Sequence, residues 1–507
     1  MATISINDFP NETLDHIFSF LPLNERKSAA LVSHRWNAVA FSPLYMHHVV
    51  LRLLGYGEAF HKRHYHLLKY SQRSYRQVVA FDAATVLQYG CGGDDCSAIR
   101  IGLLLAVVEW FKDSLDSLHC LASISQKDFL RVLQSAPNLQ YLSVALNDTG
   151  RSGDNSEIVF PVMPKVTTLG LFFDDHSIDF DIVKIFPNVT SFSTNMDKNL
   201  LKAVQVLEQK NETLQALQLT SLNTLLPVTE INFSKLELLH IYSKNLIDIE
   251  SFPQLGQFNL LREAIIEFPI TDQMLIALTR DCRNMQKLHF QVSEVSRLGF
   301  HSLENLQQLQ LLSLYGSIRP HIMYHCKPMP SVRQLDVNIH IEDTAVRVFQ
   351  QFGRIFTKLE HIRIIFRRCS ELNNIIPYLR HLRTLKRLTM VNYYGWFTVE
   401  QITKRLAVKA LLDREEVSLK RIDLPAWNVL PNDTLRRLIL HSLPTTSKRR
   451  LIRMVDLCRG LHYLEVHDCR KITSGTIRLI RERRPEIVIN YMEHNSVNKA
   501  MQYTRRQ

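Results

Sequence analysis

FPNETLDHIFSFLPLNERKSAALVSHRWNAVAFSPLY, residues 9–45, predicts three short helices. In the first, Asn11 is placed to cap the helix and Pro22 to end it, because an asparagine side chain accepts an orphan backbone N–H and proline has none to donate. Between them, apolar residues recur at the i, i+3, i+4, i+7 spacing of one helix face, at Leu14, Ile17, Phe18 and Leu21.

The second and third helices follow directly along the chain. We expect Asn24 to cap the second helix, which would carry Ala29, Leu31 and Val32. Ser33 is placed to cap the third helix, whose inner side would be formed by Trp36 and Val39. The three helices together predict a small helical domain at the N-terminal end of the chain.

This helical unit has more apolar side chains than it can hide. Three helices in fewer than 40 residues do not bury a self-sufficient core, so such a unit usually needs a partner. The side chains that we expect on an intermolecular face are Phe9, Pro10, Leu14, Ile17, Leu21, Pro22 and Leu44. The alternative is a helical cap that seals the N-terminal end of a longer solenoid.

The same residues resemble an F-box. The family pattern is matched by Phe9-Pro10-Asn11-Glu12-Thr13-Leu14, Ile17-Phe18-Ser19-Phe20-Leu21-Pro22, Val32-Ser33-His34-Arg35-Trp36 and Leu44-Tyr45, with Phe9, Ser33 and Tyr45 in place of the frequent leucine, cysteine and tryptophan. The resemblance implies docking to a Skp-type adaptor that in turn holds a cullin. It implies adaptor contacts by Phe9, Pro10, Glu12, Leu14, Ile17, Phe18, Leu21, Pro22, Val32, Trp36 and Leu44.

A second pattern, L-x-x-L-x-L with some apolar substitution, dominates the rest of the chain. It begins at Leu115 and returns every 22 to 27 residues as far as Leu385, with later matches at Leu419 and Leu461. This period is typical of leucine-rich repeats, in which each unit is a short strand followed by a helix or turn. One unit cannot bury its own apolar side, so neighbouring units must stack.

The spacing lengthens after Leu385, and extra helices are expected there. We predict helices at 398–412, 433–440 and 448–457, so that LRRLIL at Leu435 is assigned to a helix rather than to a cramped extra repeat. Residues 485–490 could supply a last edge strand. Two segments, ending at Cys282 and running through Cys458 and Cys469, resemble the cysteine-containing subclass of these repeats, and their thiols are expected to fill core niches.

The predicted fold class is therefore α/β: an N-terminal three-helix F-box and a curved leucine-rich-repeat solenoid, with a parallel strand ladder on the concave side and helices on the convex side. The predicted boundaries are 4–48 for the F-box, 49–74 for linker helices, 75–493 for the solenoid and 494–507 for a frayed tail.

Charge and cysteine usage constrain the surroundings of the chain. The net charge of +12 over 507 residues is uneven, because residues 354–507 hold 31 Lys and Arg against 14 Asp and Glu. This excess favours an acidic partner, although arginines on solvated helix faces would explain it equally well. The eight cysteines have no paired spacing and nothing near Met1 resembles a signal peptide, so we expect a cytoplasmic or nuclear protein with free thiols and no contact with a membrane.

The sequence offers no catalytic constellation. It has no phosphate-binding glycine loop, no G-x-S-x-G and no H-E-x-x-H, and its 16 glycines are few. His321, His325 and Cys326 have helix-like spacing for a metal, but they lie between prolines and a fourth ligand is missing. We therefore expect neither an enzyme nor a metal or other cofactor.

The repeats should instead offer a binding face. Residues between the inward apolar positions of each strand point away from the core. On the later repeats this face includes a cluster of cationic and aromatic residues that could bind an acidic or phosphorylated segment of a protein substrate. The members of this predicted substrate-binding set are His361, Arg363, Arg387, Arg421, Tyr463 and His467.

The sequence thus favours a non-catalytic substrate receptor of an SCF-type (Skp–cullin–F-box) ubiquitin ligase. The alternative is a basic leucine-rich-repeat scaffold that binds nucleic acid or another acidic partner without any ligase role. Nucleic acid is the less favoured partner, because aromatic residues are not interleaved at the spacing that base stacking prefers.

Overall fold

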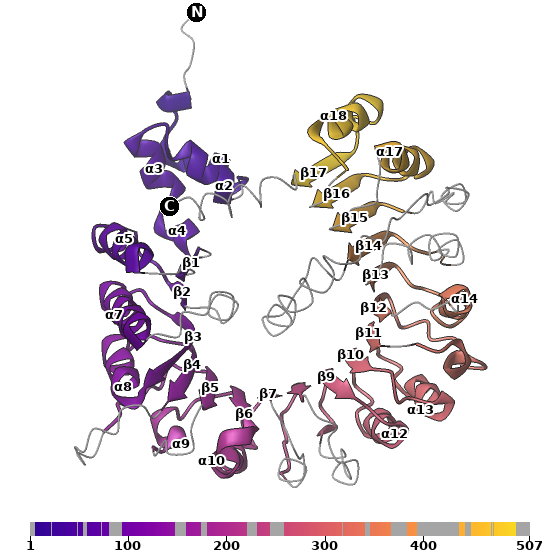
Figure 1. Ribbon diagram of the computed structural model, residues 1–507, viewed down its shortest axis with the longest axis horizontal. Coiled ribbons are helices and arrows are strands. Elements are labelled where there is room, and N and C mark those ends of the chain that lie inside the picture. The colour runs from indigo at the N-terminus through magenta and orange to yellow at the C-terminus, as the bar shows by residue number, and fades with distance from the viewer. Residues whose placement is uncertain are drawn as a thin grey trace, which may run out of the picture. The chain divides into compact units, whose positions relative to one another are not determined.

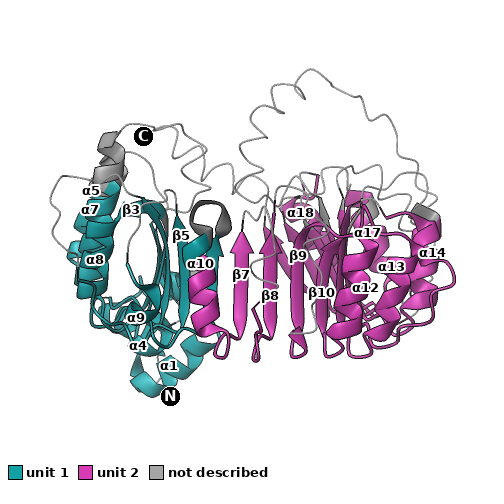
Figure 2. Ribbon diagram, turned by 90° about the horizontal axis from the view of Figure 1, so that it is seen from below, with its two compact units in different colours: residues 1–202 teal, residues 203–507 magenta. Residues whose placement is uncertain are grey.

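The computed structural model divides into two compact units, residues 1–202 and 203–507, with the boundary inside helix α10 (Met196–Lys210) (Figure 2). The structure describes residues 6–21, 23–47, 49–53, 58–71, 73–80, 94–147, 159–173, 180–220, 231–243, 258–316, 318–339, 345–366, 382, 384–392, 435–441, 448–467, 469 and 471–492.

Unit 1 begins with the predicted group of short helices (Figure 1). A 3₁₀ turn at Ile6–Asp8 precedes α1 (Asn11–Ser19), α2 (Leu23–Ala29), α3 (His34–Ala40) and α4 (Pro43–Met46). The expected cap at Ser33 is confirmed, because its Oγ accepts the Trp36 N–H at 3.1 Å. The other two expected caps are wrong: Pro10 holds the N-cap position of α1, and Asn24 lies inside α2.

The helices pack around a small core of their own. Its buried members are Leu14, Phe18, Val39, Ala40 and Tyr45. The Phe18 and Trp36 rings meet edge to face with centroids 5.3 Å apart, an arrangement that aromatic quadrupoles favour. Leu31 and Val32 were predicted on the second helix, but α2 ends before them and both side chains are exposed.

The strand ladder of unit 1 is entirely parallel. Each strand pairs with the next in chain order. The strands are β1 (Val50–Leu53), β2 (Gln77–Ala80), β3 (Ser117–Ser125), β4 (Tyr141–Asn147), β5 (Thr168–Phe173) and β6 (Ser191–Asn195). Their helices are α5 (Glu58–Lys69), α7 (Asp94–Trp110), α8 (Gln126–Ser135) and α9 (Ile182–Ile185). The ladder begins at β1, inside the segment that was predicted as a linker.

Unit 2 continues the same design. Its strands run parallel and pair in order. They are β7 (Ala216–Thr220), β8 (Leu238–Tyr242), β9 (Glu263–Pro269), β10 (Lys287–Gln291), β11 (Leu311–Gly316), β12 (Gln334–Ile339), β13 (His361–Phe366), β14 (Arg387–Asn392), β15 (Arg437–His441), β16 (Tyr463–His467) and β17 (Val488–Met492). The strands line the inner side of an arc, and the helices α12 (Asp272–Asp281), α13 (Arg297–Ser302), α14 (Ala345–Ile355), α17 (Lys448–Leu457) and α18 (Ser474–Arg483) lie on its outer side (Figure 1).

The register of the ladder explains the leucine spacing. Leu335, Ile362, Leu388 and Leu438 stand side by side on four successive strands, and none is more than 1 % exposed. The period of two places the intervening residues on the opposite face. The predicted α/β solenoid is therefore confirmed, and its core is a continuous row of aliphatic side chains.

Asparagines join successive repeats at the turns that precede the strands. The side-chain amides of Asn138, Asn188 and Asn284 each donate to a backbone carbonyl of the preceding repeat, at 3.3, 2.8 and 3.2 Å. These bonds provide donors for backbone carbonyls that take no part in the strand ladder. The cysteines of the later repeats fill the core as expected, since Cys282, Cys458 and Cys469 are buried free thiols.

The segment around Leu435 differs from the prediction. LRRLIL contains strand β15, which pairs with both β14 and β16, so the helix expected at 433–440 is wrong. Leu and Arg favour helix locally, but Leu435, Leu438 and Leu440 have the same spacing as the other repeats, and pairing overrides local propensity. The expected strand at 419–424, the helix at 398–412 and the tail at 494–507 lie outside the described residues. The helix at 448–457 is confirmed as α17, and the last strand expected at 485–490 is present as β17 but displaced to Val488–Met492.

Candidate functional site

The apolar stripe of α1 mostly serves the helical domain itself. Leu14 is 0 % and Phe18 1 % exposed, so these two side chains offer no surface to a partner. Phe9, Ile17, Leu21 and Trp36 are half-buried and pack against the same core. Leu14, expected on an intermolecular face, and Phe18, one of the adaptor contacts that the resemblance implies, thus lie in the core of this chain, where they hold the helices together.

Other apolar side chains of the helical domain do face solvent. The exposed fractions are 74 % for Phe20, 88 % for Leu31, 59 % for Val32 and 62 % for Leu44. Val32 and Leu44 were predicted site residues; Phe20 and Leu31 were not. Large apolar groups left in water at this density in a small domain are typical of an interaction site. We call these four residues the exposed apolar set.

The remaining predicted adaptor contacts frame this set. Pro10 and Glu12 are exposed at the start of α1, and Pro22 lies outside the described residues. The exposure of Leu31 has a physical cause, since it follows the end of α2 in the turn that leads to α3. The exposure of Leu31 depends on where α2 ends, and the spacing of the leucines does not predict that position.

Arg35 fixes the segment that precedes α1. Its Nε donates to Asn11 Oδ1 at 2.8 Å, its Nη1 to the Asn7 carbonyl at 2.6 Å, and its Nη2 to the Phe9 carbonyl. The Trp36 indole N–H also donates to Asn7 Oδ1, at 3.0 Å. A guanidinium group has five N–H donors, so one arginine can bond to several acceptors at once. Arg35 and Asn7 are positioning residues that the sequence pattern did not indicate.

The inner face of unit 2 carries a first polar group on β8 to β11. His240 Nε2 donates to Glu267 Oε1 at 3.0 Å, and this bond lowers the pKa of Glu267. His289 Nδ1 lies 2.6 Å from Ser313 Oγ, and burial lowers the pKa of the imidazole. The Tyr315 ring stacks on His289 at 4.9 Å, and its hydroxyl donates to the Ile266 carbonyl at 3.0 Å. These side chains thus bond to one another or to the backbone of a neighbouring strand.

A second, cationic group follows on β13 to β15 of the same face. His361 on β13 is in register with Arg387 on β14, and Arg387 is in register with Arg437 on β15. Arg363 lies two residues further along β13, beside Thr389. Burial and then the Arg387 charge lower the pKa of His361. The structure thus brings together three predicted substrate-binding residues: His361, Arg363 and Arg387.

Arg437 holds the place in this group that was expected for Arg421. Arg421 lies outside the described residues, and the strand that pairs with β14 is β15. Arg437 continues the row to Tyr463, with its guanidinium carbon 4.3 Å from the centre of the Tyr463 ring. The leucine spacing of LRRLIL could have placed Arg437 on the strand face. Because this stretch was assigned to a helix, Arg437 was not predicted.

Tyr463 and His467, the last two predicted residues, both contact Glu465. The Tyr463 hydroxyl donates to Glu465 Oε2 at 2.8 Å, and His467 Nε2 lies 3.1 Å from Oε1. Burial and the neighbouring carboxylate raise the pKa of Tyr463. Glu465 therefore contacts two residues of its own strand, and the Tyr463 ring lies under the Arg437 guanidinium.

The residues considered for a metal do not come together as the sequence suggested. The structure instead groups His301, Glu304 and Cys326, whose potential ligand atoms lie within 4.8 Å of one another. Each has a protein partner: His301 Nε2 lies 2.8 Å from the Tyr324 carbonyl, and Glu304 accepts the Lys327 backbone N–H at 2.8 Å. Burial raises the pKa of Cys326 to about 11, which keeps its thiol protonated at neutral pH. These bonds fix the turn in which His325 has a positive φ of 65°.

Comparison with known proteins identifies the N-terminal helices. Residues 6–52 match the model of the F-box-like family.

They form an F-box-like domain.

No curated protein matches the chain. Among solved structures, the one titled "Crystal structure of LRIM1/APL1C complex" is similar over 72 % of this chain and 70 % of that chain, at 10 % identity and a TM-score of 0.23. Nothing about the repeats is concluded from so distant a likeness. They are assigned from the strand ladder itself. None of the described helices is long and apolar enough to span a bilayer.

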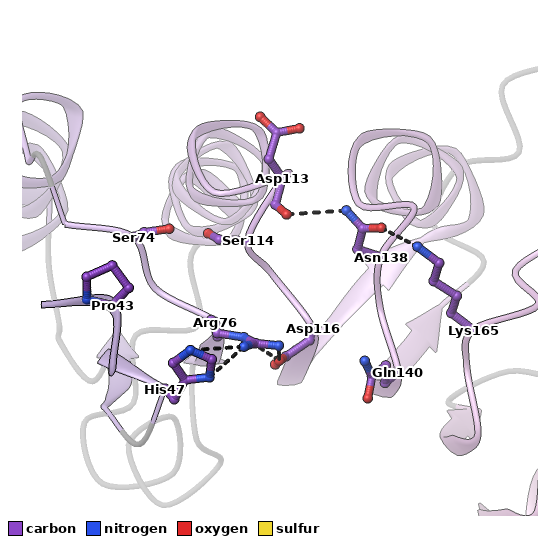
Figure 3. Close-up of a pocket in the computed structure, with 10 residues that line it drawn as sticks. All are labelled: Pro43, His47, Ser74, Arg76, Asp113, Ser114, Asp116, Asn138, Gln140 and Lys165. Atoms are coloured by element: carbon purple, nitrogen blue, oxygen red, sulfur yellow. Dashed lines mark hydrogen bonds and ion pairs between the residues drawn. The ribbon is translucent and has the colours of Figure 1, made fainter. Parts of the chain in front are cut away.

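A polar cavity lies where the F-box-like domain meets the first repeats (Figure 3). Its volume is about 530 Å³, and the residues that line it are Pro43, His47, Ser74, Arg76, Asp113, Ser114, Asp116, Asn138, Gln140 and Lys165. Arg76 Nε donates to Asp116 Oδ2 at 2.7 Å and its Nη1 contacts the His47 ring, while the Gln77 amide donates to the His47 carbonyl at 3.3 Å. These bonds tie the domain to β2 and β3. These contacts connect the F-box-like domain to the first repeats within unit 1.

Proposed function

We propose that this chain is a non-catalytic substrate-recognition subunit of an SCF-type ubiquitin ligase. In this proposal the F-box-like domain docks a Skp-type adaptor, and through it a cullin, while the repeats bind a protein target. The observation that carries the proposal is an F-box-like domain whose own core is complete and which still exposes four large apolar side chains. A parallel repeat ladder behind it fits an F-box/leucine-rich-repeat architecture.

The adaptor would cover the exposed apolar set, together with Pro10 and Glu12. Leu14 and Phe18 would act indirectly, by holding the helices in place. Burying an exposed leucine or phenylalanine contributes about 1.5–3 kcal/mol, so four such residues supply enough for a stable contact. The mechanism is tethering: a target held on the repeats meets a ubiquitin-conjugating enzyme at raised effective concentration. The place of action would be the cytoplasm or the nucleus.

Co-purification with a Skp-type adaptor tests this proposal. The test variant is Leu31→Ser, Val32→Ser and Leu44→Ser together, which changes only side chains that are at least 59 % exposed. We expect adaptor affinity to fall about a hundredfold or more, because central apolar contacts dominate interface energies. The control variant, Leu201→Ser with Leu298→Ser, changes leucines that are 85 % and 73 % exposed on the repeats and should bind normally.

Thermal denaturation of both variants completes the design, and each should unfold at the temperature of the unmodified chain. Adaptor binding that survives the triple substitution would overturn the proposed docking surface. An unmodified chain that does not bind the adaptor at all would overturn the ligase role.

A further inference from the structure

The charges on the inner face of unit 2 are not all neutralised. Where cations stand on or just before other strands, a carboxylate accompanies them: Lys287 pairs with Glu263 at 2.7 Å, and Arg333 and Lys386 share Glu360 at 2.7 and 3.1 Å. Among the described residues, no carboxylate forms an ion pair with Arg387 or Arg437. Two guanidinium groups thus stand in register, on strands about 4.8 Å apart, without an ion-paired carboxylate among the described residues.

Neighbouring residues add to the positive potential instead of cancelling it. His361 flanks Arg387 on one side, and Arg363 lies on the same strand as His361. The lowered pKa of His361 has Arg387, Lys386 and Arg437 among its causes after burial, as expected where a proton meets existing positive charge. Asp336, in register with Arg363, is the nearby carboxyl group, and burial raises its pKa despite the two arginines.

The side chain of Arg437 is also held in place by a neighbouring residue. Its guanidinium carbon lies over the Tyr463 ring, 4.3 Å from the ring centre, and the Tyr463 hydroxyl donates to Glu465. A guanidinium that contacts an aromatic ring still keeps N–H donors for an oxyanion. A planar donor group fixed in this way loses less conformational entropy when it binds.

We propose that β13 to β15 bind an anionic segment of the protein target, a phosphorylated residue or a run of carboxylates, gripped between Arg387 and Arg437. This inference rests on the proposed function, in which the repeats hold the target. Paired arginines form charge-assisted, bidentate hydrogen bonds with phosphate or carboxylate oxygens. An anion at this place relieves the repulsion between the two guanidinium groups, neither of which forms an ion pair with a described carboxylate.

The surroundings favour a short peptide over a nucleic acid. The cationic row covers three strands, and Asp336 and Glu465 lie at its two sides. Carboxylates on both sides of the row repel a phosphate backbone that extends past it, whereas a short anionic segment faces only the cationic row. Tyr463 is the one aromatic ring that contacts the row among the described residues, whereas single-stranded nucleic acid stacks on successive rings.

Fluorescence anisotropy with defined probes tests this site on the full chain. The probes are four fluorescein-labelled molecules: a nine-residue peptide with a central phosphoserine, the same peptide with three central glutamates, the same peptide with neutral serines, and a single-stranded RNA of twelve nucleotides. We expect the two anionic peptides to bind at least about tenfold more tightly than the neutral one at low salt. Their ratio tells whether phosphate or carboxylate is preferred.

Arg387→Glu with Arg437→Glu should reduce anionic peptide binding by about tenfold or more. Arg387→Gln with Arg437→Gln should give a smaller loss in the same direction, and it covers the case in which the charge reversal disturbs folding. The matched control is Arg449→Glu with Arg453→Glu, two exposed arginines on α17 that give the same change in net charge and should leave binding unchanged.

Equal binding of neutral and anionic peptides, or unchanged binding by both double variants, overturns the proposal. RNA that binds more tightly than the peptides and is lost with Arg387→Gln and Arg437→Gln also overturns it, in favour of a nucleic-acid site. Adaptor affinity is measured on the same samples. It should be unchanged in every variant, so a failure of the anion site remains distinguishable from a failure of the ligase role.

Discussion

Two leucine-to-alanine changes in the F-box-like domain should differ in their effect on its stability. Leu14 is 0 % exposed and lies in a core with Phe18, Val39, Ala40 and Tyr45. Leu14→Ala removes three carbon atoms from that core, at about 0.8 kcal/mol each, and leaves a cavity, so the total cost is about 2–5 kcal/mol. A domain of this size has little more stability than that. We therefore expect Leu14→Ala to unfold the helices locally.

Leu31→Ala is the matched control for this change. Its side chain is 88 % exposed, so the expected effect on stability lies within about 0.5 kcal/mol. Hydrogen exchange of the full chain, followed by mass spectrometry, measures both. Backbone amides of α1 and α3 should exchange much faster in Leu14→Ala, while amides of β10 to β14 keep their protection. Equal exchange in the two variants would refute the division of this domain into core and surface.

Three further outcomes are expected. Thr389→Cys with Ile439→Cys should form a disulfide on mild oxidation, visible as a mass loss of about two daltons, because the two residues are in register on β14 and β15 at a Cα separation of about 4.8 Å. Cys120 should resist iodoacetamide at pH 8 until urea is added, since burial raises the pKa of its thiol to about 12. The unfolding midpoint in urea should fall as the pH drops below about 6.5, the ordinary pKa of histidine, because burial lowers the pKa of His289 and the unfolded chain then binds a proton that the folded chain does not. His289→Gln should show a smaller fall over the same pH range.

Local sequence patterns were sufficient for most of the architecture. The L-x-x-L-x-L spacing places apolar side chains on one side of each strand, and the structure buries them, as with Leu335, Ile362 and Leu388. The period itself requires stacking. Ser33 could be identified as a cap because a capping bond spans only three residues, from Ser33 to Trp36.

The proposed docking surface could not be predicted in the same way. The spacing of Leu14, Ile17, Phe18 and Leu21 shows that they share a helix face, but it does not show what that face meets. The packing of α1 against α3 and of Tyr45 against both decides that Leu14 and Phe18 are interior. Exposure of Leu31 and Phe20 then follows from where α1 and α2 end, and helix ends are poorly fixed by sequence.

The charged side chains on the inner face of unit 2 depend on which stretch forms the strand after β14, and the sequence alone leaves this open. Two stretches in the long interval after Leu385 have the repeat spacing, one at Leu419 and one at Leu435. Either could follow β14, and each would bring an arginine to the same row, Arg421 or Arg437. Pairing of β14 with β15 selects Arg437, and the next strand then places Tyr463 beneath its guanidinium. In the proposed anion site, Arg437 can act together with Arg387 only because the ladder sets the two side by side. The specificity proposed for this face is therefore a property of strand register, and a shift of one repeat would place a different residue beside Arg387.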